Sequence, residues 1–162
     1  MKTEQRCWSR EEGWSGNTTS GNLKDAQLVL LFGHPSNLKN ETLFKEICQS
    51  YPNAYILSGS TAGEILKTRV YDDSLVATAI WFENTVIKTT HLKIKDRSDS
   101  LSIGEELVRV LDQEGLCHVF VLADGLNVNG SELVKGMVKH LPEGVKVTGG
   151  LTGDGGDFKE TF

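Results

Sequence analysis

The amino-acid sequence predicts an α/β domain with a mixed sheet built from two duplicated parallel β-α-β units plus a β-hairpin, flanked by helices. Three observations predict this fold class. Short apolar segments alternate with amphipathic segments, a proline follows each of two predicted helices, and the same order of features occurs twice. Strands and helices that alternate along a chain form parallel sheets through right-handed crossover connections.

The first β-α-β unit begins with the apolar residues 27–32, which are typical of a strand buried on both faces. Residues 41–51 carry apolar side chains at helical spacing, and Pro52 ends the helix that they predict. Residues 54–57 predict a second strand, which leads directly into the small-residue loop 58–64.

A β-hairpin is expected after this unit, with its arms at residues 74–82 and 86–94 and its turn at residues 83–85. The amphipathic segment that follows predicts a helix. This helix begins at Ser98 or Asp99, since either side chain can cap a helix N-terminus.

The second unit has the same order of elements as the first. Its predicted elements are strands at residues 118–122 and 145–148, a helix at residues 131–141 that Pro142 ends, and a glycine loop at residues 149–156.

A shift of 90 positions superposes the two units without a gap and indicates an internal duplication. The shift pairs Pro52 with Pro142, Gly59 with Gly149, Gly63 with Gly153, and Glu64 with Asp154. The first unit continues into the predicted hairpin, whereas only a short segment follows the second. We therefore expect the natural protein, or a partner domain, to continue past Phe162.

The expected domain spans residues 25–162 and is incomplete at its C-terminal end. Residues 1–24 include many polar, glycine and serine residues. Because such a segment offers little apolar surface to bury, we expect it to be a loop or a loosely attached segment.

Composition and charge exclude several classes of protein. The formal net charge is -5 and no stretch concentrates Lys or Arg, which argues against nucleic acid as the main partner. The longest apolar run, residues 28–32, is too short to span a membrane, and the N-terminus lacks the apolar core of a signal peptide. The three cysteines form no C-x-x-C pair, so we expect a reduced, cytoplasmic protein.

Four polar loops follow predicted strands and form the expected binding site, because ligands of open α/β sheets lie outside the carboxyl ends of parallel strands. These loops are residues 33–36, 58–64, 124–131 and 148–155. The alternative is that they are only tight turns. The expected ligand-binding residues are His34, Ser58, Ser60, Thr61, Glu64, Asp124, Asn127, Asn129, Ser131, Gly149, Gly150 and Asp154.

Motifs of catalysis and of cofactor binding are not found. The four histidines lack the spacing of a metal site, and neither glycine loop has a Walker or dinucleotide-binding pattern. We expect no catalytic residues and no metal. The alternative from another class is a hydrolase or transferase that uses Ser60, Asp124 or Asp154.

Three segments resemble the FIST N-terminal domain family and together cover most of residues 27–162. Residues 58–65 look like the family's G-C-S-T-A-G-E-I segment. Residues 123–133 are similar to its A-D-G-L-x-x-N-G-x-x-L stretch, and residues 147–154 resemble its V-x-G-G-L-A-G-D stretch.

This resemblance implies an intracellular sensory domain for small ligands, proposed to include amino acids, that acts in signal transduction. It implies a C-terminal FIST companion domain and a signalling partner such as a histidine kinase, a cyclase or a chemoreceptor. Some members are reported to bind haem and to sense nitric oxide, so a haem-based sensor is a further alternative. We expect no cofactor in this chain.

An amino-acid ligand would need an acid for its ammonium group and fixed donors for its carboxylate. The acids at strand ends are Asp124 and Asp154, with Glu64 as the equivalent in the first unit. Asp124 could instead cap its own turn. Backbone amides near Ser131 and in the glycine loop are the expected donors.

Overall fold

The computed structural model describes residues 1–16 and 23–162 and divides the chain into two compact units. Unit 1 comprises residues 1–87 and 153–162, and unit 2 comprises residues 88–152. None of the helices among the described residues is long and apolar enough to cross a membrane.

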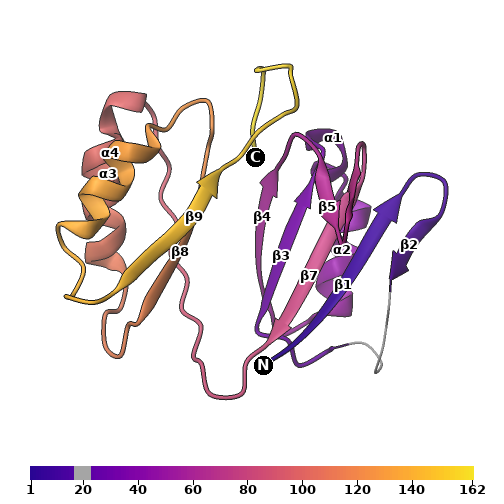
Figure 1. The fold of residues 1–162 in the computed structure, drawn as a ribbon, viewed down its shortest axis with the longest axis horizontal. Coiled ribbons are helices and arrows are strands. Elements are labelled where there is room, and N and C mark those ends of the chain that lie inside the picture. The colour runs from indigo at the N-terminus through magenta and orange to yellow at the C-terminus, as the bar shows by residue number, and fades with distance from the viewer. Residues whose placement is uncertain (17–22) are drawn as a thin grey trace. The chain divides into compact units, whose positions relative to one another are not determined.

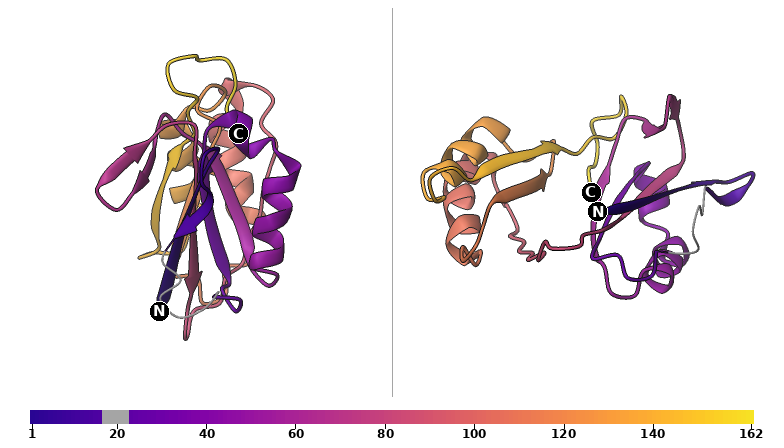
Figure 2. Two further views of the ribbon diagram at one scale, coloured as in Figure 1. Left: turned by 90° about the vertical axis from the view of Figure 1, so that its right-hand side faces the viewer. Right: turned by 60° about the horizontal axis from the view of Figure 1, so that its bottom comes forward.

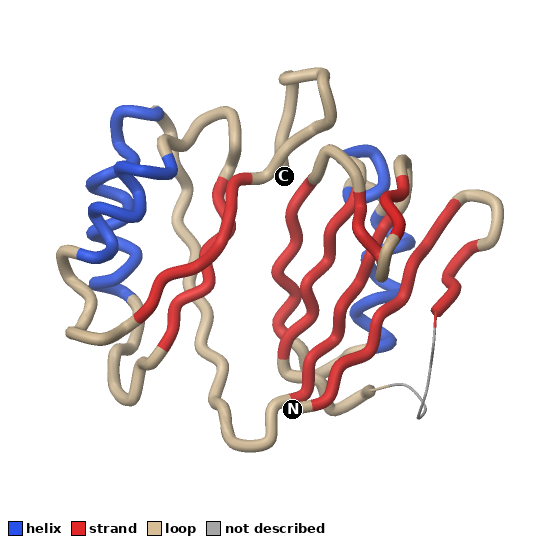
Figure 3. The backbone as a smooth tube through the Cα atoms, viewed as in Figure 1, coloured by secondary structure: helices blue, strands red, loops and turns tan. Residues whose placement is uncertain are grey.

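Unit 1 is built on a mixed sheet (Figures 1 and 3). Its elements are β1 (Lys2–Ser9), β2 (Gly13–Gly16), β3 (Leu28–Gly33), α1 (Pro35–Leu38), α2 (Glu41–Ser50), β4 (Tyr55–Ser60), β5 (Glu64–Leu66), β6 (Arg69–Tyr71) and β7 (Leu75–Trp81). The strand order is β2-β1-β7-β3-β4, with β3 parallel to β4 and β7 antiparallel to both of its neighbours.

Unit 2 pairs two strands with two helices. Its elements are a 3-10 turn (Arg97–Asp99), α3 (Ser100–Val110), β8 (His118–Ala123), α4 (Gly130–Val138) and β9 (Lys146–Leu151). Strands β8 and β9 are parallel, as are β3 and β4, and the predicted helices connect both pairs. The predicted α/β class and both parallel pairs are confirmed, whereas the duplication itself stays a prediction.

The helices of unit 1 lie on one face of its sheet (Figure 2). Val29 and Leu31 of β3 are buried on that face together with Ile47 of α2. The alternate residues of β3, among them Leu30 and Phe32, are only half-buried. The expectation that this strand is buried on both faces is therefore wrong, because helices cover a single face.

An N-terminal hairpin extends the sheet beyond β7, because β1 pairs with β7 on one side and with β2 on the other. The side chain of Glu4 is buried, and its carboxylate accepts hydrogen bonds from Tyr51 Oη at 2.9 Å and from the Leu23 amide at 3.0 Å. The expected loop over residues 1–24 is thus corrected for β1 and β2. The part of that prediction that concerns residues 17–22 lies outside the described residues.

The predicted hairpin of residues 74–82 and 86–94 is wrong in its second arm. Strand β7 forms, but residues 86–94 adopt no strand in the described structure. Both edges of β7 are already paired, one with β1 and one with β3, so no edge is left for a hairpin partner. A shorter antiparallel hairpin, β5–β6, precedes β7 instead.

Two glycines let α3 and α4 of unit 2 cross in backbone contact. A Cβ atom on Gly104 would lie 2.2 Å from Leu133 O, and one on Gly136 would lie 2.1 Å from Leu101 O. Any larger residue at either position must push the helices apart. This crossing holds the core of Val108, Val128, Leu133 and Met137 together.

We predict that Gly136→Ala lowers the free energy of unfolding by about 1–3 kcal/mol, since the added methyl overpacks a backbone contact. Gly150→Ala is the matched control in the same unit, because a Cβ atom there meets nothing within 4 Å. Urea unfolding followed by circular dichroism measures both. Equal stabilities of the two variants would contradict the crossing as a constraint.

Tyr51→Phe should lower the free energy of unfolding by about 1–3 kcal/mol, because it leaves the buried Glu4 carboxylate with one donor fewer. Tyr55→Phe, at an exposed position, serves as the control.

Burial first, and then the hydrogen bond to Glu4 and its charge, raises the pKa of Tyr51 from 10.0 to about 12. The folded state therefore holds the phenol proton more tightly than the unfolded state.

This contribution to stability is complete below about pH 10 and is lost as the pH rises through about 12. Unfolding of the wild type between pH 8 and 12 should show this loss, and Tyr51→Phe should lack it. A wild type and variant with parallel pH profiles would refute the Glu4–Tyr51 contact.

Candidate functional site

The structure brings predicted strand-end loops together by main-chain hydrogen bonds, one of which runs from the Gly153 amide to Ser60 O at 2.8 Å and joins loops 58–64 and 148–155. In unit 1, the Thr61 amide after β4 donates to Gly33 O at the end of β3 at 3.2 Å. In unit 2, the Thr152 amide after β9 donates to Ala123 O at the end of β8 at 2.8 Å. Adjacent parallel strands end at the same sheet edge, so each pair of loops is a local consequence of the topology.

Unit 1 has a solvent-open pocket of about 370 Å³, the unit 1 cavity, between β5 and the sheet strands β1, β3 and β7. Two predicted residues, Thr61 and Glu64, line it. The full set of lining residues is Gln5, Phe32, Thr61, Gly63, Glu64, Ile65, Val76 and Thr78.

Glu64 is the one charged residue among those that line this cavity, and it is 1% exposed. Its Oε1 accepts a hydrogen bond from Thr61 Oγ1 at 2.7 Å. Its Oε2 accepts from the Ser74 hydroxyl at 2.7 Å and from the Ser74 amide at 3.2 Å. Glu64 therefore fastens β5 to the start of β7 and to the loop after β4.

Ser60 is also buried and is bonded to the segment that ends unit 1. Its hydroxyl accepts a hydrogen bond from the Phe162 amide at 2.9 Å, its amide donates to Phe162 O, and its carbonyl accepts from the Gly153 amide. Ser58 is exposed on β4. The hydroxyl of Ser60 is thus engaged in holding main chain, which does not favour its use as a nucleophile.

His34 caps the short helix α1. Its Nδ1 accepts a hydrogen bond from the Ser36 amide at 3.3 Å and lies 2.9 Å from Ser36 Oγ. Its Nε2 lies 3.8 Å from Asp73 Oδ1 at a solvent-exposed position. The capping role accounts for this histidine at the end of β3.

Asp154 organises the final segment of unit 1. Its carboxylate accepts hydrogen bonds from the amides of Phe158, Lys159 and Glu160 at 3.0, 2.6 and 2.9 Å. The amide of Glu160 is the main cause that lowers the pKa of this carboxyl. An acid with three amide donors is held in its charged form.

Asp124 in unit 2 accepts hydrogen bonds within its own turn. Oδ1 receives the amides of Leu126 and Asn127 at 2.9 and 3.1 Å, and Oδ2 receives Asn127 Nδ2 at 2.8 Å. Asn129 caps α4 through the Glu132 amide, and Ser131 is exposed in the first helical turn. These contacts match the capping role that the sequence left open for Asp124.

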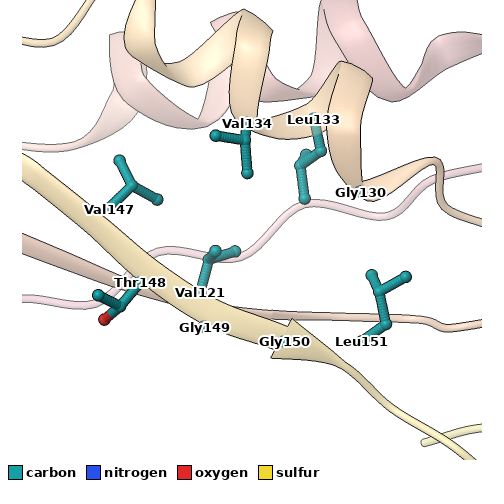
Figure 4. A pocket seen from close by; sticks show the side chains of 9 residues that line it. All are labelled: Val121, Gly130, Leu133, Val134, Val147, Thr148, Gly149, Gly150 and Leu151. Atoms are coloured by element: carbon teal, nitrogen blue, oxygen red, sulfur yellow. The ribbon is translucent and has the colours of Figure 1, made fainter.

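A second cavity, of about 330 Å³, lies between α4 and β9 in unit 2 (Figure 4). Gly149 and Gly150 line it, as do the side chains of Val134 and Leu151. A Cβ atom on Gly149 would lie 1.8 Å from Val121 O, so this position accepts only glycine. All nine lining residues are uncharged: Val121, Gly130, Leu133, Val134, Val147, Thr148, Gly149, Gly150 and Leu151.

Six residues that line the unit 1 cavity are not among the expected ligand-binding residues, although Gly63 lies in the expected loop 58–64: Gln5, Phe32, Gly63, Ile65, Val76 and Thr78. Phe32 and Val76 have the apolar character of ordinary strand residues, and Val76 is itself buried, so their residue types do not mark them as cavity residues. Gln5 lies in a segment that was expected to be a loop, so no signal pointed to it.

The two cavities do not fit a haem. Their lining residues include neither histidine, cysteine, methionine nor tyrosine, which are the side chains that ligate haem iron. Neither cavity therefore offers an axial ligand for a haem.

A protein-family model described as FIST N domain matches residues 27–162. The match covers β3 to the end of the chain and leaves β1 and β2 outside it. Comparisons with curated proteins and with solved structures gave no match.

We predict that Asp154→Asn lowers the melting temperature at pH 7, because the neutral asparagine side chain lacks the negative charge that attracts three main-chain N–H groups. Asp157→Asn, an exposed acid in the same loop, is the control. Since folding lowers the pKa of Asp154, its contribution is present above pH 3.8 and is lost as the pH falls further. The melting temperatures of wild type and Asp154→Asn should converge in acid, and a constant gap down to pH 2 would contradict this role.

Proposed function

The chain belongs to the FIST N domain family, a family of sensory domains of signal transduction proteins, and from this membership we propose its role. The domain binds a small polar metabolite such as an amino acid in the cytoplasm and passes the occupancy of its site to a signalling partner. The catalytic step of the pathway lies in that partner.

The observation that carries this proposal is the unit 1 cavity at the predicted loop 58–64. This loop is also the part of the chain that resembles the family's glycine-rich segment. The cavity combines apolar walls with a few polar groups, which is the usual composition of a small-molecule site, and its volume of about 370 Å³ suits a small metabolite.

The walls of the cavity suggest how occupancy is passed on. Gly63, Glu64 and Ile65 belong to the β5–β6 hairpin or to the loop before it, and all three line the cavity. On the same hairpin, the cross-strand pair Ile65 and Val70 is 67% and 69% exposed. A ligand in the cavity therefore contacts the same hairpin that presents an exposed apolar surface, and a partner can bind that surface.

The proposed partners are a C-terminal FIST companion domain and a signalling module such as a histidine kinase, a cyclase or a chemoreceptor. Family membership supports this part of the proposal, since FIST domains occur in signalling proteins. The alternative of a hydrolase or transferase has less support, because Ser60, Asp124 and Asp154 are all engaged with main-chain groups.

A thermal-shift screen of the common amino acids and other small metabolites, followed by calorimetric titration of each hit, tests this function. We expect at least one hit to bind the wild type. Thr61→Val should weaken that binding about 2- to 10-fold, the value of one neutral hydrogen bond. The control is Thr89→Val, at an exposed position of unit 2. The proposal fails if no compound binds, or if Thr61→Val binds every hit as tightly as the control.

A further inference from the structure

We propose that residues 88–95 of unit 2 are a docking strand for a partner protein, which supplies an extended acidic segment that pairs with them edge to edge. None of these residues lines the unit 1 cavity. The inference therefore goes beyond the function proposed for that cavity and does not rest on it.

Residues 88–95 have the composition of a strand but no strand partner. They contain none of Gly, Pro, Asn and Asp, the residues that favour exposed turns. They form neither helix nor strand, and none of the main-chain hydrogen bonds found among the described residues involves them. A row of unpaired N–H and C=O groups is a template on which another strand can pair.

Contacts at both ends hold this segment in place. Lys88 Nζ forms an ion pair with Asp112 Oδ2, and Ile94 packs against the core of unit 2. Asp96, directly after the segment, has an extended backbone with φ -137° and ψ 143°. Figure 3 shows the connection before α3 as a drawn-out tan tube. A partner would thus meet a segment that is already extended, so that little ordering opposes the pairing.

The side chains of the segment alternate between the core and solvent. Leu92 and Ile94 are half-buried. His91, Lys93 and Lys95 are exposed. Alternate residues of an extended chain share one face and lie about 6.5 Å apart, so the exposed face of this segment is basic.

The charge of this face indicates the chemistry of the partner. Residues 88–95 contain three lysines and no acid, in a chain whose formal net charge is -5. None of the ion pairs found among the described residues includes Lys93 or Lys95. Acidic side chains at alternate positions of a paired strand would lie beside these lysines.

A peptide matches this surface better than a nucleic acid does. The unpaired main chain of residues 88–95 offers both N–H donors and C=O acceptors. A second extended peptide supplies both kinds of group, whereas phosphate oxygens only accept hydrogen bonds. In docking of this kind the main-chain pairing gives affinity and the alternate side chains give selectivity.

Labelled probes of equal length test the docking by fluorescence anisotropy on the whole chain. A peptide of alternating Glu and Val should bind. A peptide of alternating Glu and Pro carries the same charge but cannot pair as a strand, so it should bind at least about 10-fold more weakly. A peptide of alternating Lys and Val should also bind at least about 10-fold more weakly, because like charges then meet. Equal binding of the Glu–Pro peptide, or of an oligothymidylate with the same charge, would overturn the proposal.

Hydrogen–deuterium exchange locates the contact. In the free protein the amides of residues 88–95 should exchange nearly as fast as those of an unfolded chain, because they have no main-chain partner. The Glu–Val peptide should slow several of them at least about 10-fold. Amides that are already protected in the free protein, or a peptide that protects only another segment, would refute the docking strand.

A charge-reversal pair tests the basic face. Lys93→Glu should weaken binding of the Glu–Val peptide about 10-fold, since it places like charges side by side. The control is Lys146→Glu, which changes the net charge equally at an exposed position of the same unit and should change binding less than about 2-fold. Equal effects of the two substitutions would contradict the assignment of Lys93.

A proline pair tests the main-chain pairing. Consecutive amides of an extended chain point to opposite sides, so either Thr89→Pro or Thr90→Pro removes a donor that a partner strand uses. Neither amide has a main-chain partner in the free protein, so the fold should tolerate both. Wild-type peptide binding by both variants would overturn strand pairing. Metabolite binding should stay unchanged throughout, since no substituted residue lines the unit 1 cavity.

Discussion

The buried carboxylate of Glu64 is the interaction on which the candidate site depends. It joins three segments that are separate in the sequence: the loop that carries Thr61, the hairpin that begins with β5, and the start of β7 at Ser74. These bonds attach the β5–β6 hairpin, which forms one wall of the cavity, to the rest of the unit. A single buried acid therefore holds together the segments that shape the site.

Asp154 is the acid that the shift of 90 positions pairs with Glu64, and it too holds a loop in place through hydrogen bonds. Asp154 also gathers hydrogen-bond donors, but they are three successive main-chain amides of one loop. Both acids follow a glycine and hold the chain just after a parallel strand. The strand registers differ by one position, since Leu28 is opposite Tyr55 whereas His118 is opposite Lys146. The glycine loops 58–64 and 149–156 thus differ in the contacts that their acids make.

The sequence could predict those elements whose signal is local. Residues 41–51 and 131–141 show helical spacing with a following proline, and helices α2 and α4 form there. Strand β1 could not be predicted, because Glu4 and Arg6 face the helix side, where Tyr51 and Ser50 satisfy them. These contacts put polar residues where a strand pattern requires apolar ones. The missing second arm at 86–94 has the opposite cause, namely strand-like residues with no free edge of β7 to pair with.

The candidate site likewise combines residues with a local sequence signal and residues that only long-range strand pairing brings to it. Thr61 and Glu64 were predicted because they lie in a glycine-rich loop after a strand, and they do line a cavity. Gln5 and Thr78 reach it only through the pairing of β1 with β7, which is a long-range contact. A crystal structure of the protein with a hit of the metabolite screen tests the central claim most directly. The account predicts the ligand in the unit 1 cavity, in contact with Thr61 and Phe32. A ligand bound only elsewhere, with the unit 1 cavity empty at saturating concentration, would contradict it.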